Sequence, residues 1–534
     1  MRRAVLWAFL VVCAVALGPG CGPRRGDDEK SLSAKDVIVW GRGSDSKGLD
    51  PAKEEDGESL KVCDNIYDGL VRYVGERFEV GPALAVRWDI SDDGLEYTFH
   101  LRSNVRFHDG TPFDSAAVVF HFRRQFDKTH PFYGVGGPNK YWNAMDMDSI
   151  VESVDAPDAA TVRFRLKESC GVFLQYLTMH FAYIPSPTAI RKYGEQYGKP
   201  VSVPAGTGPF KFRDWDKGVR IVLEANADYW GEKPKIKRVI YRPFPDPTAR
   251  LLSLRSGELD GMQFPELDVL QGMKEDANIT QIRKPALNIA YLAMNCSKKP
   301  FDDVRVRQAV AYAIDKKVIV EALYGGIGQV AKNPIPPGMP GYNNDIEDYP
   351  CDPQKARGLL AAAGYPNGFE TDFWYMSNSR PYIINPKEVA LLIQSDLRKV
   401  GIRAKAETIE WGAYLDYVGK GKHSMALLGW SADIADADNF FGPLLSIPAS
   451  QPPHAQNIAF YRSEPLQKII EEARAATNQY RRVELYRDAC RIVHDDAPWV
   501  PLVHTSQVVL VRSNVHGIKV PVITKIIFNT AWKD

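Results

Sequence analysis

Residues 385–429 read NPKEVALLIQSDLRKVGIRAKAETIEWGAYLDYVGKGKHSMALLG. Asn385-Pro386 opens a predicted helix whose apolar residues recur at helical spacing, and the glycine Gly401 ends it. A strand over 402–409, a short helix from Trp411 and the buried strand MALLG follow. This helix–strand–helix–strand order predicts an α/β fold.

The same pattern extends over residues 289–504. Asp302 or Asp303 is expected to begin one helix that continues, through apolar residues four apart, to Gly325-Gly326. Earlier in the chain the residue pattern differs. Asp93-Gly94 is typical of a hairpin turn, and residues of alternating polarity follow it. We therefore expect residues 84–202 to form a small α+β insertion.

Three short segments carry a cation, aromatic rings and an anion. They are Ser379-Arg380-Pro381-Tyr382, Glu410-Trp411-Gly412 and Gly429-Trp430-Ser431-Ala432-Asp433. The loop after a buried strand is where open α/β sheets bind ligands, and residues 430–441 form such a loop. Together the segments could hold a small zwitterion at both ends. Taken alone, the residues are also compatible with an ion pair, a helix cap and ordinary lobe packing.

Composition limits the classes of partner. The chain has 534 residues, with 45% hydrophobic and 25% charged residues, which are ordinary values for globular domains. Its formal net charge is +1, so the charge balance gives no sign of binding to nucleic acid or to an acidic membrane surface. Two to four domains are expected from this length.

The N-terminus is typical of an export signal. Arg2 and Arg3 precede an apolar stretch over 4–17, which is shorter than the about 18 residues expected of a membrane span. We expect a lipoprotein signal peptide over 1–21, with Cys21 as the lipid anchor, and a linker over 22–35. Cleavage by an ordinary signal peptidase is the alternative. No later apolar segment is long enough to span a membrane.

Catalytic and metal-binding motifs are absent from the sequence. It has no H-E-x-x-H, G-x-S-x-G or phosphate-binding P-loop pattern, and its cysteines are far apart without a CxxC pair. Asp433, Asp436 and Asp438 could hold a cation, but capping and loop solvation explain them better. Paired carboxylates of a hydrolase could occur among 66 acidic residues, although no motif supports this. We expect no enzyme activity, no cofactor and no metal.

Several further segments, taken in order, resemble family 5 of the bacterial extracytoplasmic solute-binding proteins. The resemblance covers nearly all of the mature chain. The segments are Leu49-Asp50-Pro51, Ile66-Tyr67-Asp68-Gly69-Leu70-Val71, Ser91-Asp92-Asp93-Gly94, Val105-Arg106-Phe107-His108-Asp109-Gly110-Thr111-Pro112-Phe113, Gly206-Thr207-Gly208-Pro209-Phe210, Tyr229-Trp230-Gly231, Ser256-Gly257-Glu258-Leu259-Asp260 and Pro300-Phe301-Asp302-Asp303-Val304-Arg305.

The resemblance implies a two-lobed periplasmic-binding-protein fold of type II, with an extra α+β domain and a ligand between lobes joined by a hinge. Lobe I would comprise 36–83, 203–288 and 505–534. Domain II would cover 84–202, and lobe III 289–504.

Within the family, the cluster is most similar to that of dipeptide binders. The resemblance then implies that Arg380 binds the ligand carboxylate, that Trp411 packs on Arg380 and that Asp433 binds the ammonium. Tyr382 and Trp430 become candidate walls of the site. From the opposing lobe, Gly57 and Glu58 are implied contacts. Ile383-Ile384 departs from the more polar relatives, and Asp436 and Asp438 are then expected to be ordinary loop residues.

The resemblance implies a monomeric periplasmic or cell-surface component of an ABC importer, which delivers dipeptides to an inner-membrane permease. The same scaffold could instead bind an oligopeptide, a nickel chelate, haem or an oligosaccharide. A secreted hydrolase, and a sensory or chaperone role for the same lobes, are the alternatives from other classes.

Overall fold

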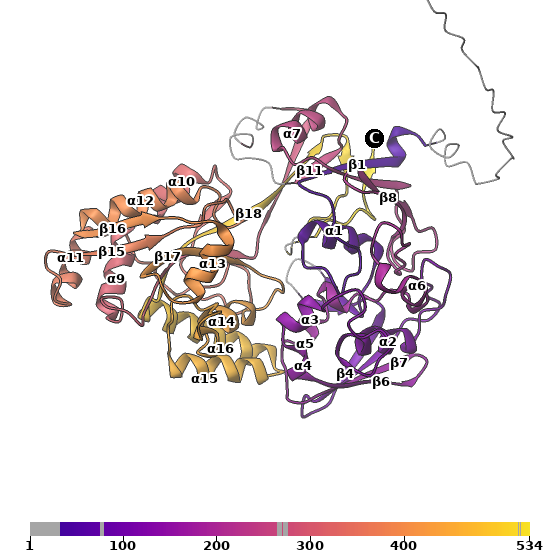
Figure 1. Ribbon diagram of the computed structural model, residues 1–534, viewed down its shortest axis with the longest axis horizontal. Helices are drawn as coiled ribbons and strands as arrows, with labels where there is room; N and C mark the ends of the chain where they lie inside the picture. Colours follow the sequence, from indigo (N-terminus) through magenta and orange to yellow (C-terminus); the bar gives the residue numbers. More distant parts are fainter. Residues whose placement is uncertain (1–31, 75–78, 264–269, 271–275, 522, 524) are drawn as a thin grey trace, which may run out of the picture.

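The computed structural model describes residues 32–74, 79–263, 270, 276–521, 523 and 525–534. Two bodies lie side by side and are joined along the long strand β18 (Trp499–Arg512) (Figure 1). The first body holds the N-terminal half of the chain and its C-terminal end. The second body is built from residues between β13 (Asn288–Met294) and β18, and it confirms the expected α/β fold.

A single mixed sheet runs through both bodies. In the described part of the chain it has twelve strands. In spatial order its main path is β16 (Ile402–Glu407), β15 (Phe369–Trp374), β17 (Met425–Ser431), β13, β18, β11 (Gly261–Gln263), β1 (Val37–Arg42), β10 (Arg238–Pro243), β9 (Arg220–Ala225) and β8 (Phe210–Asp216). The strands β12 (Ile279–Pro285) and β14 (Gly328–Val330) also pair with β18.

β18 belongs to both bodies because its two halves have different partners. Residues 499–503 pair with β13, and residues 506–512 pair with β12. Two residues, Ala286 and Leu287, separate β12 from β13. The chain therefore passes between the bodies twice, at 286–287 and near 504–505, and both passages lie next to each other.

Helices cover both faces of the sheet in the second body (Figure 1). They are α9 (Val304–Ala313), α10 (Lys316–Leu323), α11 (Pro353–Ala362), α12 (Pro386–Lys399), α13 (Trp411–Gly419), α14 (Asp438–Leu445), α15 (Glu464–Ala475) and α16 (Gln479–Asp496). The expected helix over 385–401 and its neighbouring strands are confirmed as α12, β16, α13 and β17.

The single helix expected from Asp303 to Gly325-Gly326 is wrong, because it is divided into α9 and α10. Asp315 lies at the break. Its side chain accepts a hydrogen bond from the backbone N–H of Val318 at 3.1 Å and so caps α10. An aspartate that satisfies free N–H groups at a helix start favours a new helix over continuation of the old one.

The first body contains a separate small sheet, as the hairpin signal at Asp93-Gly94 predicts. Its strands are β4 (Ala85–Ile90), β5 (Glu96–Leu101), β7 (Thr161–Leu166) and β6 (Val151–Asp158). The two-stranded ribbons are β2 (Val71–Val74) with β3 (Glu79–Pro82) and β19 (Val515–His516) with β20 (Trp532–Lys533). The helices are α1 (Gly57–Ile66), α2 (Ser115–Phe126), α3 (Lys140–Ala144), α4 (Met147–Ile150), α5 (Phe173–Tyr176), α6 (Pro187–Tyr193) and α7 (Pro247–Ser256).

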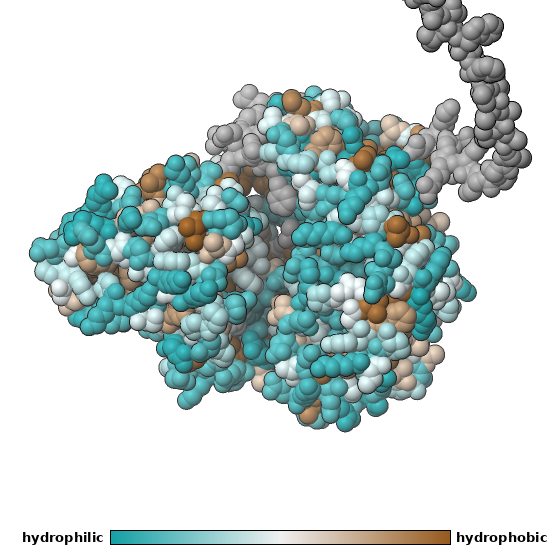
Figure 2. Space-filling view, viewed as in Figure 1, coloured by the Kyte–Doolittle hydropathy of each residue, from teal (hydrophilic) through white to brown (hydrophobic). Residues whose placement is uncertain are grey.

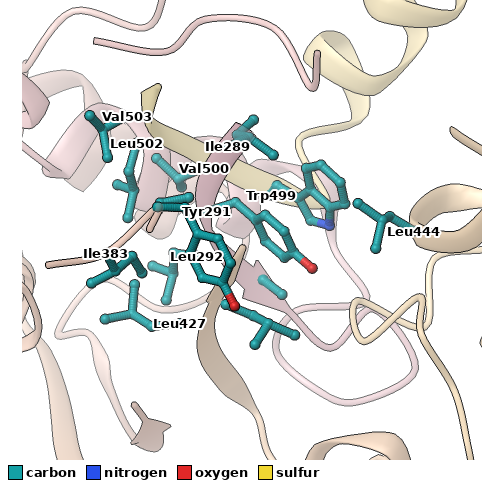
Figure 3. Packing of buried hydrophobic residues seen from close by; sticks show 14 of the residues in the cluster. Ile289, Tyr291, Leu292, Ile383, Leu427, Leu444, Trp499, Val500, Leu502 and Val503 are labelled. Atoms are coloured by element: carbon teal, nitrogen blue, oxygen red, sulfur yellow. The ribbon is translucent and has the colours of Figure 1, made fainter. Parts of the chain in front are cut away.

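The largest buried cluster follows β18 from the second body into α7 and β11. At its centre Tyr291 of β13 stacks on Trp499 of β18, with ring centroids 4.0 Å apart (Figure 3). The outer face visible in Figure 2 is mostly hydrophilic, and its hydrophobic residues are scattered. Apolar burial thus supports the junction between the bodies as well as each body's interior.

Candidate functional site

Arg380 begins a tight turn in the second body. Its backbone N–H donates to the carbonyl of Ile383 at 2.8 Å, and the N–H of Ile383 donates back to the carbonyl of Arg380 at 3.0 Å. The guanidinium carbon lies 3.8 Å from the centroid of the Trp411 ring, in a cation–π contact. The expected packing of Trp411 on Arg380 is therefore present.

The charge of Arg380 has no counterpart among the described residues. Its side chain is half-buried and makes no ion pair there, and its Nε is buried without a hydrogen-bond partner. Burying an unpaired cation is costly. A planar guanidinium with free donors is suited to a carboxylate, which it can bind through two parallel hydrogen bonds.

The indole of Trp411 is held by the start of α13. The side chain of Glu410 caps this helix, because its Oε2 accepts hydrogen bonds from the N–H groups of Gly412 at 2.8 Å and Ala413 at 3.2 Å. These same N–H groups lower the pKa of Glu410. One turn later the Tyr414 hydroxyl donates to the carbonyl of Leu427 at 2.5 Å, which fixes α13 against β17.

Asp433 lies in the loop after β17. The hydroxyl of Tyr141, on α3 in the first body, donates to Oδ1 of Asp433 at 3.1 Å. Desolvation raises the pKa of Asp433 to about 6, and the bond from Tyr141 opposes this shift. Among the described residues no cation pairs with this carboxylate. Asp433 thus lies at the boundary between the bodies, and its carboxylate has no cationic partner among the described residues.

The neighbouring carboxylates differ from Asp433, because each has a cationic partner. Arg482 contacts Asp436 at 2.6 Å, and Arg474 contacts Asp438 at 3.1 Å. Both aspartates are buried. The expectation that they are ordinary loop residues is wrong: their ion pairs fix the loop to α15 and α16. In the described part of the chain no group of His, Cys, Asp and Glu side chains is arranged to hold a metal ion.

Trp430 and Asp433 share one partner. The indole N–H of Trp430 donates to Oδ1 of Asn439 at 3.1 Å, and the backbone N–H of Asp433 donates to the same oxygen at 2.9 Å. Trp430 remains partly exposed beside the loop, as a wall of the site would. Asn439, at the start of α14, therefore sets the orientation of both.

Tyr382 is more deeply packed than a candidate wall needs to be. It is 8% exposed, and burial raises its pKa to about 12. Its ring lies against Gly429, where an added Cβ would come within 2.2 Å of a ring carbon. Only glycine at 429 allows this approach. In this structure Tyr382 supports the turn that carries Arg380.

Ile383 belongs to the core. It is one of the two isoleucines that stand where the family's residues are more polar. It is fully buried, and Figure 3 places it beside Leu292 and Leu427. Ile384 is half-buried. Ile383 and Ile384 therefore fix the Arg380 turn to the core of the second body.

Gly57 and Glu58 form the first turn of α1, which Asp56 caps by accepting from the N–H of Ser59 at 3.0 Å. Gly57 is exposed, and nothing lies within 4 Å of a Cβ added there. Glu58 pairs with Lys61 at 3.3 Å. The start of α1 lies close to α3, because Glu55, two residues before Gly57, pairs with Lys140 at 2.9 Å.

The sequence alone did not predict Tyr141 and Asn439, which contact Asp433. Tyr141 is 292 positions from Asp433 in the chain. No local pattern of residues reveals a contact of that separation, and only the packing of α3 against the second body creates it.

The expected signal peptide, the linker up to residue 31 and the lipid site Cys21 lie outside the described residues. Among those described, no helix is long and apolar enough to cross a membrane. The five described cysteines are free; they are Cys63, Cys170, Cys296, Cys351 and Cys490.

Comparison with known proteins agrees with the resemblance. The model of the bacterial extracellular solute-binding proteins, family 5, matches residues 79–451. The heme-binding protein A of Haemophilus influenzae is 38% identical over 512 residues, which cover 93% of this chain and 92% of the relative. The dipeptide-binding protein of Escherichia coli is 38% identical over 501 residues, which cover 91% and 92%.

A solved structure gives the same result for the fold. The ABC transporter-associated periplasmic binding protein DppA from Helicobacter pylori, in complex with peptide STSA, superposes with a TM-score of 0.75 at 40% identity. The match covers 93% of this chain and 98% of that chain. The two-lobed periplasmic-binding-protein fold is thereby confirmed.

Proposed function

Because the chain belongs to family 5 of the bacterial extracellular solute-binding proteins, we propose that it binds dipeptides by their two charged ends and delivers them to an ABC permease. One observation carries this proposal. Arg380 and Asp433 have opposite charges, each is partly buried, and neither has an oppositely charged partner among the described residues.

A dipeptide supplies what both groups lack. Its carboxylate pairs with Arg380, and its ammonium pairs with Asp433. The backbone of two residues spans about 7 Å at 3.3–3.6 Å per residue, so a longer peptide would move one end away from its partner. Leaving a charged end buried and unpaired costs several kcal/mol, which makes the two groups a measure of ligand length. Trp411, Trp430 and Tyr141 surround the ends without reading a particular side chain.

The remaining features follow from this role. Residues 36–83, 203–288 and 505–534 form one lobe, 84–202 the additional domain and 289–504 the other lobe, and they close over the ligand by bending at β18. Export is directed by residues 1–21, and Cys21 anchors the mature protein to a membrane. The protein acts as a monomer in the periplasm or at the cell surface, and it catalyses no reaction of its own.

The test is calorimetric titration with alanyl-alanine, its C-terminal amide and its N-acetyl form. We expect Arg380→Ala to weaken binding of alanyl-alanine more than tenfold and to abolish the preference for the free carboxylate, because the carboxylate then lacks its partner. Arg403→Ala is the matched control, since Arg403 is an exposed arginine paired with Glu370 on the outer strands β15 and β16.

Unchanged affinity of Arg380→Ala for alanyl-alanine would contradict the proposal. Haem, named in one of the relatives, is titrated in parallel by its absorbance. Tight haem binding that survives Arg380→Ala, without dipeptide binding, would replace the dipeptide with another solute on the same scaffold.

A further inference from the structure

The two passages between the bodies meet in a small polar group of side chains. Asn288, the first residue of β13, donates from Nδ2 to the Thr505 hydroxyl at 2.7 Å. Its Oδ1 accepts the backbone N–H of Thr505 at 2.9 Å. Both side chains are buried. Asn288 therefore joins the second passage of the chain to the first.

The same group reaches the turn that carries Arg380. The hydroxyl of Thr505 donates its proton to the carbonyl of Pro381 at 2.8 Å. Pro381 has no N–H to offer, so its carbonyl is the one backbone group it contributes. Because the Thr505 oxygen accepts from Asn288 while its proton goes to Pro381, the three groups form a directed chain of hydrogen bonds.

The loop that carries Asp433 starts from the same place. The backbone N–H of Ala432 donates to the carbonyl of Leu287 at 2.7 Å. Leu287 is next to Asn288 in the chain, and Asn288 pairs with Ser431 in the β13–β17 ladder. The residue before Asp433 and the residue after Arg380 are thus both hydrogen-bonded to the junction between the bodies.

We propose that Asn288 and Thr505 are positioning residues that set the place of the Arg380 guanidinium relative to the Asp433 carboxylate, and thereby the ligand's end-to-end length. Neither residue needs to touch the ligand. Thr505 acts through Pro381, and Asn288 acts through Thr505. This inference rests on the proposed binding of a dipeptide carboxylate by Arg380.

The first test is Thr505→Val, which keeps the shape of the side chain and removes the hydroxyl. We expect the affinity for alanyl-alanine to fall about threefold to tenfold, the range given by one lost hydrogen bond. The affinity for its C-terminal amide should fall less, because the misplaced group is the one that binds the carboxylate. Thr505→Ser keeps the hydroxyl and should restore both affinities.

The second test is Asn288→Asp, which keeps the acceptor for the Thr505 N–H but replaces the amide donor with a carboxylate oxygen. That oxygen draws the Thr505 proton away from Pro381, so the same selective loss is expected. Thermal unfolding of each variant checks that it folds, and Asn288→Asp remains informative if Thr505→Val does not.

The ratio of affinities for alanyl-alanine and its amide decides the outcome, because general destabilisation would lower both equally. An unchanged ratio in a folded Thr505→Val or Asn288→Asp variant would overturn the inference while Arg380→Ala still removes the preference. If Arg380→Ala leaves that preference intact, the proposed function fails and the positioning role fails with it.

Discussion

At Asp433 the raising of the pKa by burial outweighs its lowering by the hydrogen bond from Tyr141. Burial disfavours the ionised carboxylate, and no described cation lies close enough to restore it. In the proposed complex the ammonium of the ligand supplies that cation. The ionised form of Asp433 is therefore disfavoured in the ligand-free protein and stabilised in the proposed complex.

This predicts a pH dependence of binding. Only the ionised carboxylate pairs with the ammonium, so the affinity for alanyl-alanine should be constant above the pKa of about 6. Below that pH the dissociation constant should rise by about tenfold per pH unit. Calorimetry between pH 7.5 and 4.5 measures the slope. Asp433→Asn should bind weakly and show no such slope; a slope that persists in this variant would assign it to another group.

The same shift affects the ligand-free fold with the opposite sign to most aspartates. The native pKa lies above the ordinary value of 3.8, so the native state binds more protons than the unfolded state between these two values. The contribution of Asp433 to the free energy of unfolding is complete below 3.8 and is lost as the pH rises through about 6.

Among the elements, α13 connects local helix chemistry to the site. Its first residue is Trp411, and the cap residue before it is Glu410. If the cap is lost, the first turn frays and the indole no longer lies flat on the guanidinium.

Glu410→Ala should therefore weaken binding of alanyl-alanine severalfold, through the start of α13 that Glu410 caps. Glu410→Gln retains an oxygen that accepts from Gly412 and Ala413, and its affinity should stay within about twofold of the original. Calorimetry compares the two. Equal losses in both variants would show that the charge, rather than the cap, matters.

The elements also show how far sequence reasoning reaches. Residues that signal local structure, such as Asn385-Pro386 before α12 and Gly401 after it, predicted helices and strands correctly. The break at Asp315 was not predicted because Val306, Val310 and Val318 are separated by multiples of four residues across it. Val318 is 48% exposed, whereas the other two are fully buried, and only packing reveals this change of face.

The site divides in the same way. Arg380, Trp411 and Asp433 lie in segments that resemble the family, and that resemblance alone predicts their roles. Tyr141 and Thr505 act through contacts between segments far apart in the chain. Such contacts depend on how β18 and α3 are packed, for which the sequence has no periodic signal.

At the scale of the whole molecule, the bodies also touch at the end opposite to β18 (Figure 1). The N–H of Gly171, just before α5, donates to the carbonyl of Arg474 at 2.7 Å, and the Ser169 hydroxyl donates to that of Ala475 at 2.8 Å. Ile434 of the Asp433 loop is fully buried within the core of the first body's small sheet.

Gly171→Ala tests whether this rim contact contributes to ligand binding. A Cβ there would lie 2.0 Å from the carbonyl oxygen of Ala476, so the two bodies cannot keep this contact unchanged. We expect a severalfold weaker affinity for alanyl-alanine and a larger radius of gyration by small-angle scattering. Gly358→Ala, in open space on α11, is the matched control and should change neither quantity. Normal affinity of Gly171→Ala would make the rim contact incidental.

The narrow junction at β18 has a mechanical consequence. The bodies are joined by a few peptide units near 286–287 and 504–505, where a relative rotation of the bodies would have its axis. Gly171 lies far from that axis, at the opposite end of the contact between the bodies. A small twist at the junction becomes a large displacement at the rim. Substitutions that alter only torsional stiffness at these units could therefore adjust how readily the protein releases its cargo, without changing any atom that touches it.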